Sequence, residues 1–221
     1  MVIAMIISGF LFLLIIVLLM VCDKLGHGVL FDLDSEAKLQ RINKDPKKFQ
    51  ISFVLLLTEH IIIITLAVML FIAFYQYNLI LAIVWTISRI TEGLINLYIE
   101  KDYWRLLKIA KQYSVSSDAG KKAQIELGHT VLKTKYSRFA FAQLFFSIGT
   151  LAYCILFVTY GVVPVLIGWF GIVASIIYGF GNGLIFVKPN IKALWNLGGL
   201  MILIFELILG VSLLYLGIFM T

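Results

Sequence analysis

Arg89 and Glu92 place opposite charges inside a segment that is otherwise apolar enough to cross a bilayer. On an α-helix they share one face with Trp85, Ser88 and Asn96, because the five residues recur at spacings of three and four. A charged side chain in mid-bilayer costs about 2.5–3.5 kcal/mol on insertion scales, so we expect this face to contact protein or enclosed water. A guanidinium and a carboxylate held there are candidates to bind a proton, a cation or a small polar ligand.

Other apolar segments carry polar side chains that are candidates to complete the same site. The candidate ligand- or ion-binding residues are Glu59, His60, Arg89, Glu92, Gln143, Asn182 and Glu206. Counting residues along the expected helices places the three glutamates and the arginine at similar depths, so one cluster is able to hold them. Because arginine stays protonated, three ionised carboxylates around it would leave two negative charges. We therefore expect a protonated glutamate, a charged histidine or a bound cation.

Small residues recur at helical spacing along the last two apolar segments. Glycine faces let helix backbones approach closely in a membrane, and Glu206 shares a face with three of these glycines, so we expect it to point into the bundle. The predicted helix-packing residues are Gly171, Ser175, Gly179, Gly183, Gly199, Gly210 and Gly217. The segment 3–22 has no polar stripe, and we expect it at the periphery of the bundle.

A metal-dependent intramembrane enzyme is a weaker interpretation of the same residues. Glu59 and His60 are about 100° apart on a helix, so the two cannot easily face one point. The sequence has no HExxH motif, no GxSxG motif and no Walker loop, and "GFGNG" at 179–183 lies inside an apolar segment where close packing explains it. We predict no catalytic residue, no metal ligand and no cofactor. Cys22 and Cys154 are expected to serve packing.

The composition predicts an integral membrane protein. Apolar residues make up 62% of the chain, against roughly 45–50% in soluble proteins. Six apolar segments are each long enough to span a bilayer: 3–22, 51–74, 79–99, 139–160, 163–187 and 195–220. The first is expected to be a span and not a secretory signal, because no Lys or Arg precedes it and no small-residue cleavage site follows. We therefore predict an all-α polytopic membrane protein, with residues 1–221 forming one transmembrane domain of six helices.

The basic residues predict the orientation of this bundle. Of the 18 Lys and Arg residues, 17 lie in the connections 23–50, 100–138 and 188–194, whereas both termini and the other two connections have none. The positive-inside rule makes the basic loops cytoplasmic, so both termini are expected on the outer side of the cell membrane. The expected partners are the lipid bilayer and anionic lipid headgroups on the cytoplasmic side. Nucleic acid is not an expected partner, because the basic residues flank the spans.

Short amphipathic helices are expected in the cytoplasmic loops. Residues 35–43 are predicted to form one, with Ser35 as its N-cap. The connection 100–138 is predicted to form two helices separated at "SVSSDAG". The first extends the segment 79–99, and its apolar face is expected to lie against the lipid headgroups; these apolar residues are Tyr103, Leu106, Leu107, Ala110 and Tyr113. A solvated connector is favoured over a partner-binding helix.

Four short stretches resemble the membrane protein family catalogued as domain of unknown function 4386. They are "INKDPKKFQIS" (42–52), "RITEG" (89–93), "YGVVP" (160–164) and "FELILGVSLLYLG" (205–217). The resemblance covers nearly the whole chain and implies a six-span bundle in a prokaryotic cytoplasmic membrane. It also implies that Arg89, Glu92 and Glu206 are recurrent polar positions. It implies no activity.

Two functions stay open on the sequence. The first is a binding or transport unit whose buried Arg/Glu cluster holds a proton, a cation or a small polar ligand. The second is a structural or regulatory membrane subunit in which the cluster only fixes helix packing, while the cytoplasmic helices dock a protein partner.

Overall fold

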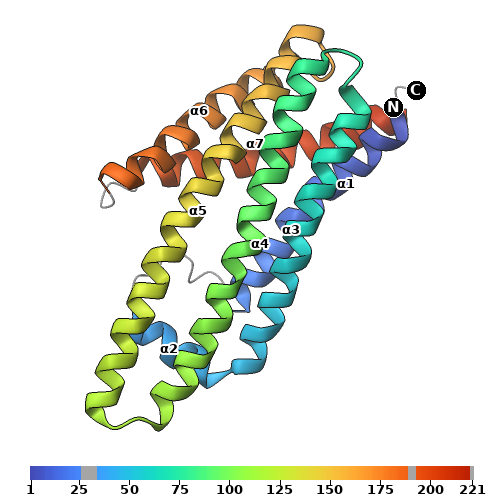
Figure 1. Ribbon diagram of the computed structural model, residues 1–221. Helices are drawn as coiled ribbons and strands as arrows, with labels where there is room; N and C mark the ends of the chain where they lie inside the picture. The colour runs from blue at the N-terminus through green and yellow to red at the C-terminus, as the bar shows by residue number, and fades with distance from the viewer. Residues whose placement is uncertain (26–33, 189–192, 220–221) are drawn as a thin grey trace. The chain divides into compact units, whose positions relative to one another are not determined.

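The chain folds into helices throughout the part that the structure describes. The computed structural model describes residues 1–25, 34–188 and 193–219, which contain seven helices and no strand (Figure 1). The helices are α1 (Val2–Lys24), α2 (Ser35–Lys44), α3 (Pro46–Phe74), α4 (Leu79–Val115), α5 (Asp118–Tyr160), α6 (Val165–Val187) and α7 (Ala193–Phe219). The all-α prediction is confirmed for these residues.

Every helix except α2 is long and apolar enough to cross a membrane. These six helices contain the six predicted segments, apart from residues 163–164, which precede α6, and residue 220, which lies outside the described residues. The chain is therefore a multi-pass membrane protein. At about 1.5 Å per residue, α4 and α5 are roughly 55 and 65 Å long, about twice the thickness of the hydrocarbon layer. A large part of each must lie outside that layer.

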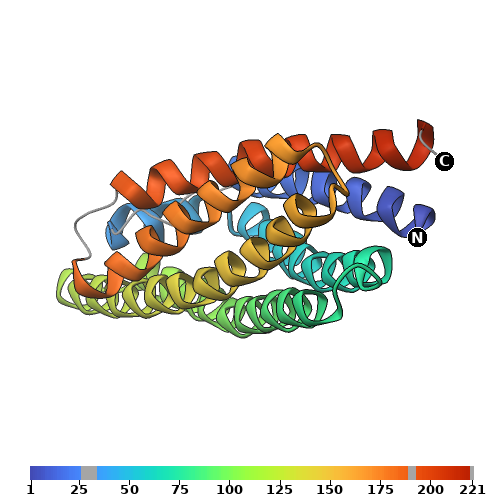
Figure 2. The ribbon, with the colours of Figure 1, turned by 90° about the horizontal axis from the view of Figure 1, so that it is seen from above.

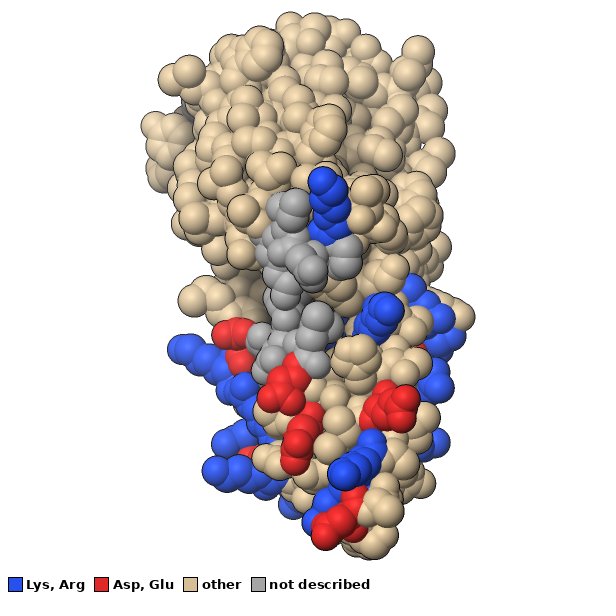
Figure 3. Space-filling view, turned by 90° about the vertical axis from the view of Figure 1, so that its left-hand side faces the viewer, with Lys and Arg blue, Asp and Glu red and all other residues tan. Residues whose placement is uncertain are grey.

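The contacts divide the chain into two compact units, which we describe separately. Unit 1 comprises Met1–Val17, Ile61–Leu94 and Ala140–Thr221, and unit 2 comprises Leu18–His60 and Ile95–Phe139. Unit 2 holds 15 of the 18 Lys and Arg residues and 10 of the 12 Asp and Glu residues. The charged side chains accordingly gather over one part of the face shown in Figure 3, and the rest of that face is nearly uncharged.

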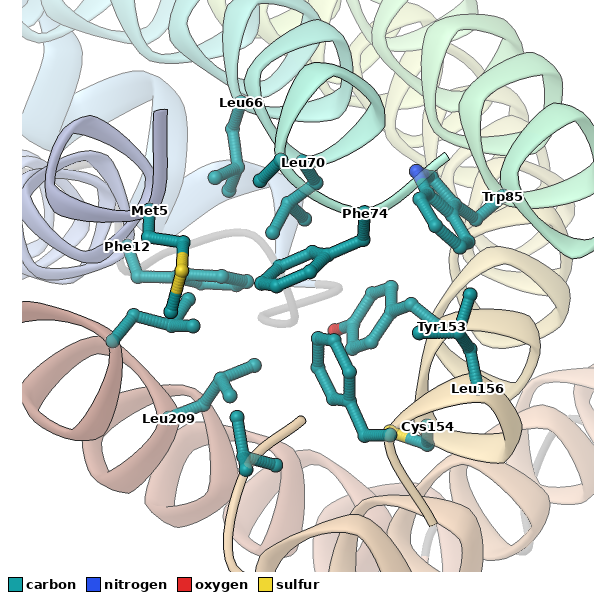
Figure 4. Packing of buried hydrophobic residues seen from close by; sticks show 14 of the residues in the cluster. Met5, Phe12, Leu66, Leu70, Phe74, Trp85, Tyr153, Cys154, Leu156 and Leu209 are labelled. Atoms are coloured by element: carbon teal, nitrogen blue, oxygen red, sulfur yellow. The ribbon is translucent and has the colours of Figure 1, made fainter. Parts of the chain in front are cut away.

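The core of unit 1 is apolar and aromatic. Phe12, Phe74, Trp85, Tyr153 and Phe205 are all at most 1% exposed. Figure 4 shows the first four of these side chains in the core. Gly161 follows α5 with a φ of +62°, a left-handed conformation that glycine adopts without steric cost. Pro164 then precedes α6. This glycine and proline explain why the chain turns between α5 and α6 instead of continuing one helix.

The part of α1 that belongs to unit 1 ends at Val17 and packs against α7. A Cβ at Gly9 would lie 2.6 Å from the carbonyl oxygen of Gly210 on α7, and Gly217 is equally close to Ile6. Figure 2 shows α1 beside α7. Phe12 and Ser8 of α1 are fully or almost fully buried. One face of this apolar helix is thus held against α7 by glycine contacts, while Ile3 and Phe10 of α1 are exposed.

Glycines also bring α6 and α7 together, although not all of them are those predicted. A Cβ at Gly198 would lie 2.5 Å from Cα of Tyr178, and one at Gly181 would lie 2.7 Å from Cα of Trp195. The predicted Gly171 contacts Cys154 and Phe205, while Gly179 faces Ser147 and Gly199 makes only an ordinary contact with Tyr178. At Gly183 no described atom lies within 4 Å of an added Cβ. The glycines that bring the backbones of α6 and α7 close together are therefore Gly181 and Gly198, which were not among the predicted packing residues.

Unit 2 has an apolar core of its own. The five apolar residues that were expected to lie against lipid headgroups are buried in this core; they are Tyr103, Leu106, Leu107, Ala110 and Tyr113. That expectation is wrong, because α2 packs beside α4 in this unit. Tyr113 donates a hydrogen bond to Glu36 Oε1 over 3.0 Å, and Leu39 of α2 is fully buried in the same core.

The capping residues of unit 2 differ by one position from the prediction. Asp34, and not Ser35, is the N-cap of α2, and its carboxylate accepts hydrogen bonds from the backbone N–H groups of Glu36 and Ala37. Asp45 follows α2 and accepts a hydrogen bond from the backbone N–H of Lys48, over 3.1 Å. Both aspartates occupy the places where a helix N-terminus leaves backbone donors without intrahelical acceptors.

Candidate functional site: two buried ionic clusters

Arg89 forms a buried ion pair inside unit 1. Its Nη1 lies 2.8 Å from Glu92 Oε2, and the two residues are 3% and 2% exposed. Both sit on α4 at a spacing of three, which places them on one face. The guanidinium carbon also lies 4.3 Å from the centroid of the Phe146 ring on α5. The expected projection of this face into protein is confirmed for Arg89 and Glu92.

A glycine makes room for the arginine stem. A Cβ at Gly149 of α5 would lie 2.9 Å from Cγ of Arg89. Neither Gly149 nor Phe146 was among the predicted site residues. Both lie beside the polar stripe of Gln143, Ser147 and Thr150 on α5, so that stripe is the signal that could have located them.

Glu206 lies near the same ion pair. It is 8% exposed on α7. The charges of Glu206 and Arg89 both act on the hydroxyls of Tyr153 and Tyr178. Glu92 acts on the hydroxyl of Tyr178 as well. We call Arg89, Glu92, Glu206, Tyr153 and Tyr178 the Arg89 cluster.

The two predicted amides extend this polar interior. The Tyr178 hydroxyl donates a hydrogen bond to Gln143 Oε1 over 3.2 Å. Asn182 accepts a hydrogen bond from Trp195 Nε1 over 3.1 Å and donates one to the carbonyl of Tyr178. Asn182 is thus engaged in joining α6 to α7, whereas Gln143 lies one hydrogen bond away from the Arg89 cluster.

Glu59 and His60 belong to a different cluster, in unit 2. His60 Nδ1 lies 2.6 Å from Glu59 Oε2, and His60 Nε2 lies 3.2 Å from Glu100 Oε1. All three residues are at most 7% exposed. Glu59 and His60 contact each other although they are about 100° apart on the helix, because the long glutamate side chain reaches across. We call Glu59, His60 and Glu100 the His60 triad.

Sequence reasoning missed Glu100 and its ionic neighbours. Asp102 is 1% exposed and lies 2.8 Å from Arg138 Nη1, which joins α4 to α5. The ammonium of Lys135 is buried 3.0 Å from the centroid of the Tyr103 ring. These residues lie in the stretch 100–138, which was expected to form two helices of a solvated amphipathic connector. Glu100 continues the polar face of α4 one turn beyond Asn96, and this continuation was the available signal.

Within the described residues, no three His, Cys, Asp or Glu side chains are grouped so that they could hold a metal ion.

Six apolar helices and two buried ionic clusters define a multi-pass membrane protein with ion pairs in its interior. The chain belongs to the family described as "Domain of unknown function (DUF4386)", whose model matches residues 7–217. This match confirms the resemblance inferred from the four short stretches. No curated protein matches the chain, and no solved structure matches it.

Proposed function

We propose that the protein is a proton-transporting membrane protein in which the His60 triad binds the proton in transit. The single observation that carries the proposal is the position of His60 between two carboxylates, one at each ring nitrogen. The proposal concerns a proton, because an imidazole beside carboxylates can take up and release one near neutral pH.

The proton count of the triad supports this proposal. A neutral imidazole carries one N–H, so it can donate to only one of the two carboxylates. The other ring nitrogen would then face a carboxylate oxygen with no hydrogen between them, and two buried lone pairs would repel. One more proton removes this conflict. Because imidazole is ordinarily more basic than a carboxylate, the additional proton belongs on His60, which then donates from both nitrogens.

The Arg89 cluster supports the proposal in a second way. It combines one permanently charged guanidinium with two carboxylates, Glu92 and Glu206. The carboxylate of Glu92 lies 2.8 Å from the guanidinium of Arg89, which compensates its charge. Glu206 is the second carboxylate of this cluster, and a carboxylate buried in a membrane-spanning helix is a candidate to take up and release a proton.

A structural or regulatory role is the second candidate function, and the inter-helix contacts favour it. The His60–Glu100 contact joins α3 to α4, and the Asp102–Arg138 ion pair joins α4 to α5. Buried pairs of this kind can fix helix register without binding any ligand. Under this alternative, removing a carboxylate would loosen the helices and change no proton movement.

Proton flux into proteoliposomes distinguishes the two functions. The purified protein is reconstituted into vesicles that contain a pH-sensitive dye, and a valinomycin-mediated potassium potential drives proton entry. We expect wild-type vesicles to acidify faster than protein-free vesicles, and Glu100→Gln to reduce the rate to the protein-free level. Glu126→Gln, which removes the same charge from an exposed position on α5, should leave the rate unchanged.

Stability measurements make the comparison decisive. Each variant is checked for a single elution peak and for its melting temperature in detergent. If wild-type vesicles acidify no faster than empty ones, or if a folded Glu100→Gln protein matches the wild type, proton transport through the triad is refuted. A variant that loses stability alone supports the structural role.

A further inference from the structure

Unit 2 contains a cavity that neither ionic cluster accounts for. Its volume is about 270 Å³, and it opens between the end of α1, the helix α2 and the first turn of α3. Five cationic side chains line it: Lys24, Lys38, Arg41, Lys44 and Lys48. All of its lining residues belong to unit 2.

The lining of the cavity is strongly cationic, because it contains one carboxylate, Asp45, and this is already paired with Lys48. Asp45 accepts a hydrogen bond from the backbone N–H of Lys48 and lies 3.4 Å from the Lys48 ammonium. The same backbone donor lowers the pKa of Asp45, so this carboxylate is ionised at neutral pH. Asp45 offsets one of the five cations, which leaves a net charge of about +4 on the lining residues.

The surroundings of the cavity indicate the kind of anion that it would hold. Cationic groups around a concave, partly enclosed surface concentrate counter-ions of opposite charge. Arg41 can hold two oxygens of one anion in its planar fork, and the lysines act as point charges. Leu25, Ile42 and Phe49 supply an apolar wall. At about 270 Å³ the cavity lies just below the roughly 300–1000 Å³ of pockets for drug-sized ligands, which suits a small anionic group.

We propose that this cavity binds a phosphate group, carried either by the headgroup of an anionic lipid or by a small soluble phosphate. Lys24 and Leu25 directly follow the apolar segment of α1, so the cavity begins where a membrane-crossing stretch of the chain ends. A lipid phosphate lies at that level of a bilayer. The apolar wall would then contact the glycerol and the first part of the acyl chains.

This site is distinct from a general attraction of basic loops to acidic lipids. Lys122 and Lys133 are also exposed and basic in unit 2, yet they do not line the cavity. Arg41 and Lys44 are exposed as well and do line it. Pairs of substitutions can therefore change the charge of unit 2 equally, inside and outside the cavity.

Ligand binding to the detergent-solubilised full chain tests the proposal. The probes are phosphatidylglycerol, zwitterionic phosphatidylcholine and inorganic phosphate, with binding of each followed by native mass spectrometry and by the shift in melting temperature. We expect saturable binding of phosphatidylglycerol or of phosphate, and none of phosphatidylcholine. Arg41→Gln/Lys44→Gln should weaken this binding about tenfold or more, because hydrogen bonds to a charged group are lost. Lys122→Gln/Lys133→Gln should weaken it less than twofold.

Each outcome decides the matter. Saturation by phosphatidylglycerol alone supports a lipid headgroup site, and saturation by inorganic phosphate supports a site for a soluble phosphate. If neither probe saturates, the proposal is overturned. Equal weakening by the two double variants overturns it too, because the attraction would then be a property of the whole basic surface. Melting temperatures without ligand show whether each double variant is folded.

Discussion

The two ring nitrogens of His60 lie against different carboxylates, Glu59 at 2.6 Å and Glu100 at 3.2 Å. Since Glu59 is its neighbour on α3 and Glu100 lies on α4, the imidazole joins a local contact to a contact between helices. The contact with Glu100 has the geometry of a hydrogen bond, whereas the contact with Glu59 is a close charge pair.

A double-mutant cycle should therefore show coupling between His60 and Glu100. Removing one partner of a buried charged pair costs about 3–5 kcal/mol, because the remaining group is left without compensation. We expect His60→Gln and Glu100→Gln each to lower the free energy of unfolding in detergent, and the double variant to lose clearly less than the sum. Additive losses would show that the 3.2 Å contact carries no energy.

Arg89 and Glu92 should be coupled in the same way, although they lie on one helix. Arg89→Gln leaves Glu92 buried at 2% exposure without its guanidinium, and we expect a loss of about 3–5 kcal/mol. Arg89→Gln/Glu92→Gln should recover part of that loss, because two neutral amides can hydrogen-bond each other. Arg89→Lys should restore less of the lost stability than the double variant does, since lysine lacks the planar fork of the guanidinium. A double variant that is less stable than Arg89→Gln would show that Arg89 does not compensate the buried charge of Glu92.

Alanine substitutions of glycines on α6 and α7 should affect stability differently at close contacts and at open positions. Gly198→Ala would bring a Cβ to 2.5 Å from the backbone of Tyr178, which cannot move out of the way, so we expect a loss of about 1–3 kcal/mol. Gly183→Ala should be neutral or slightly stabilising, because no described atom lies within 4 Å and alanine favours a helix. Melting temperatures of the two variants check this. Equal melting temperatures for the two variants would show that the close contact at Gly198 does not limit the packing of α6 against α7.

Asp45 gives the stability a small dependence on pH. Its pKa lies below the ordinary value of 3.8, chiefly because the backbone N–H of Lys48 donates to the ionised form. A carboxylate with a depressed pKa in the folded state contributes stability above its unfolded pKa and loses that contribution as the pH falls through the folded value. We expect Asp45→Asn to melt below the wild type at neutral pH, and this difference to shrink as the pH falls through the lowered pKa of the folded state. A constant difference across this range would contradict the capping role.

Cysteine labelling in intact cells tests the predicted orientation. In a background without Cys22 and Cys154, single cysteines replace Tyr77, between α3 and α4, and Asp118, at the start of α5. Because the basic connections are expected in the cytoplasm, an impermeant thiol reagent should label position 77 and not position 118. Labelling of position 118 alone would reverse the orientation of the whole bundle.

The positions of the six spans could be predicted because about 20 apolar residues suffice to cross a bilayer, and each segment met that length. The continuation of α4 beyond residue 99 was also predicted, whereas the partner of its apolar face was not. The charged half of α4 carries apolar residues at helical spacing, such as Tyr103 and Leu106, and this pattern is the same whether the face meets lipid or protein. Only the packing of α2 against α4 shows that this face of α4 contacts protein.

The burial of Arg89, Glu92 and Glu206 followed from the cost of exposing charge to hydrocarbon. Their partners did not follow, because the sequence does not state which helix faces which. Glu100 was missed since it stands one residue beyond the predicted span, where a charge seemed to mark the boundary. Glu59 and His60 were assigned to the arginine on depth alone, and depth does not distinguish neighbouring helices.

Nitrogen NMR of His60 tests the central claim most directly. The chain has three histidines, so His27→Gln and His129→Gln leave His60 as the only signal in protein labelled with ¹⁵N-histidine. At neutral pH the ring should show both nitrogens protonated, because each faces a carboxylate, and Glu100→Gln should convert it to a neutral ring with one N–H. A wild-type ring that is neutral, with the same tautomer in Glu100→Gln, would contradict a proton held between Glu59 and Glu100.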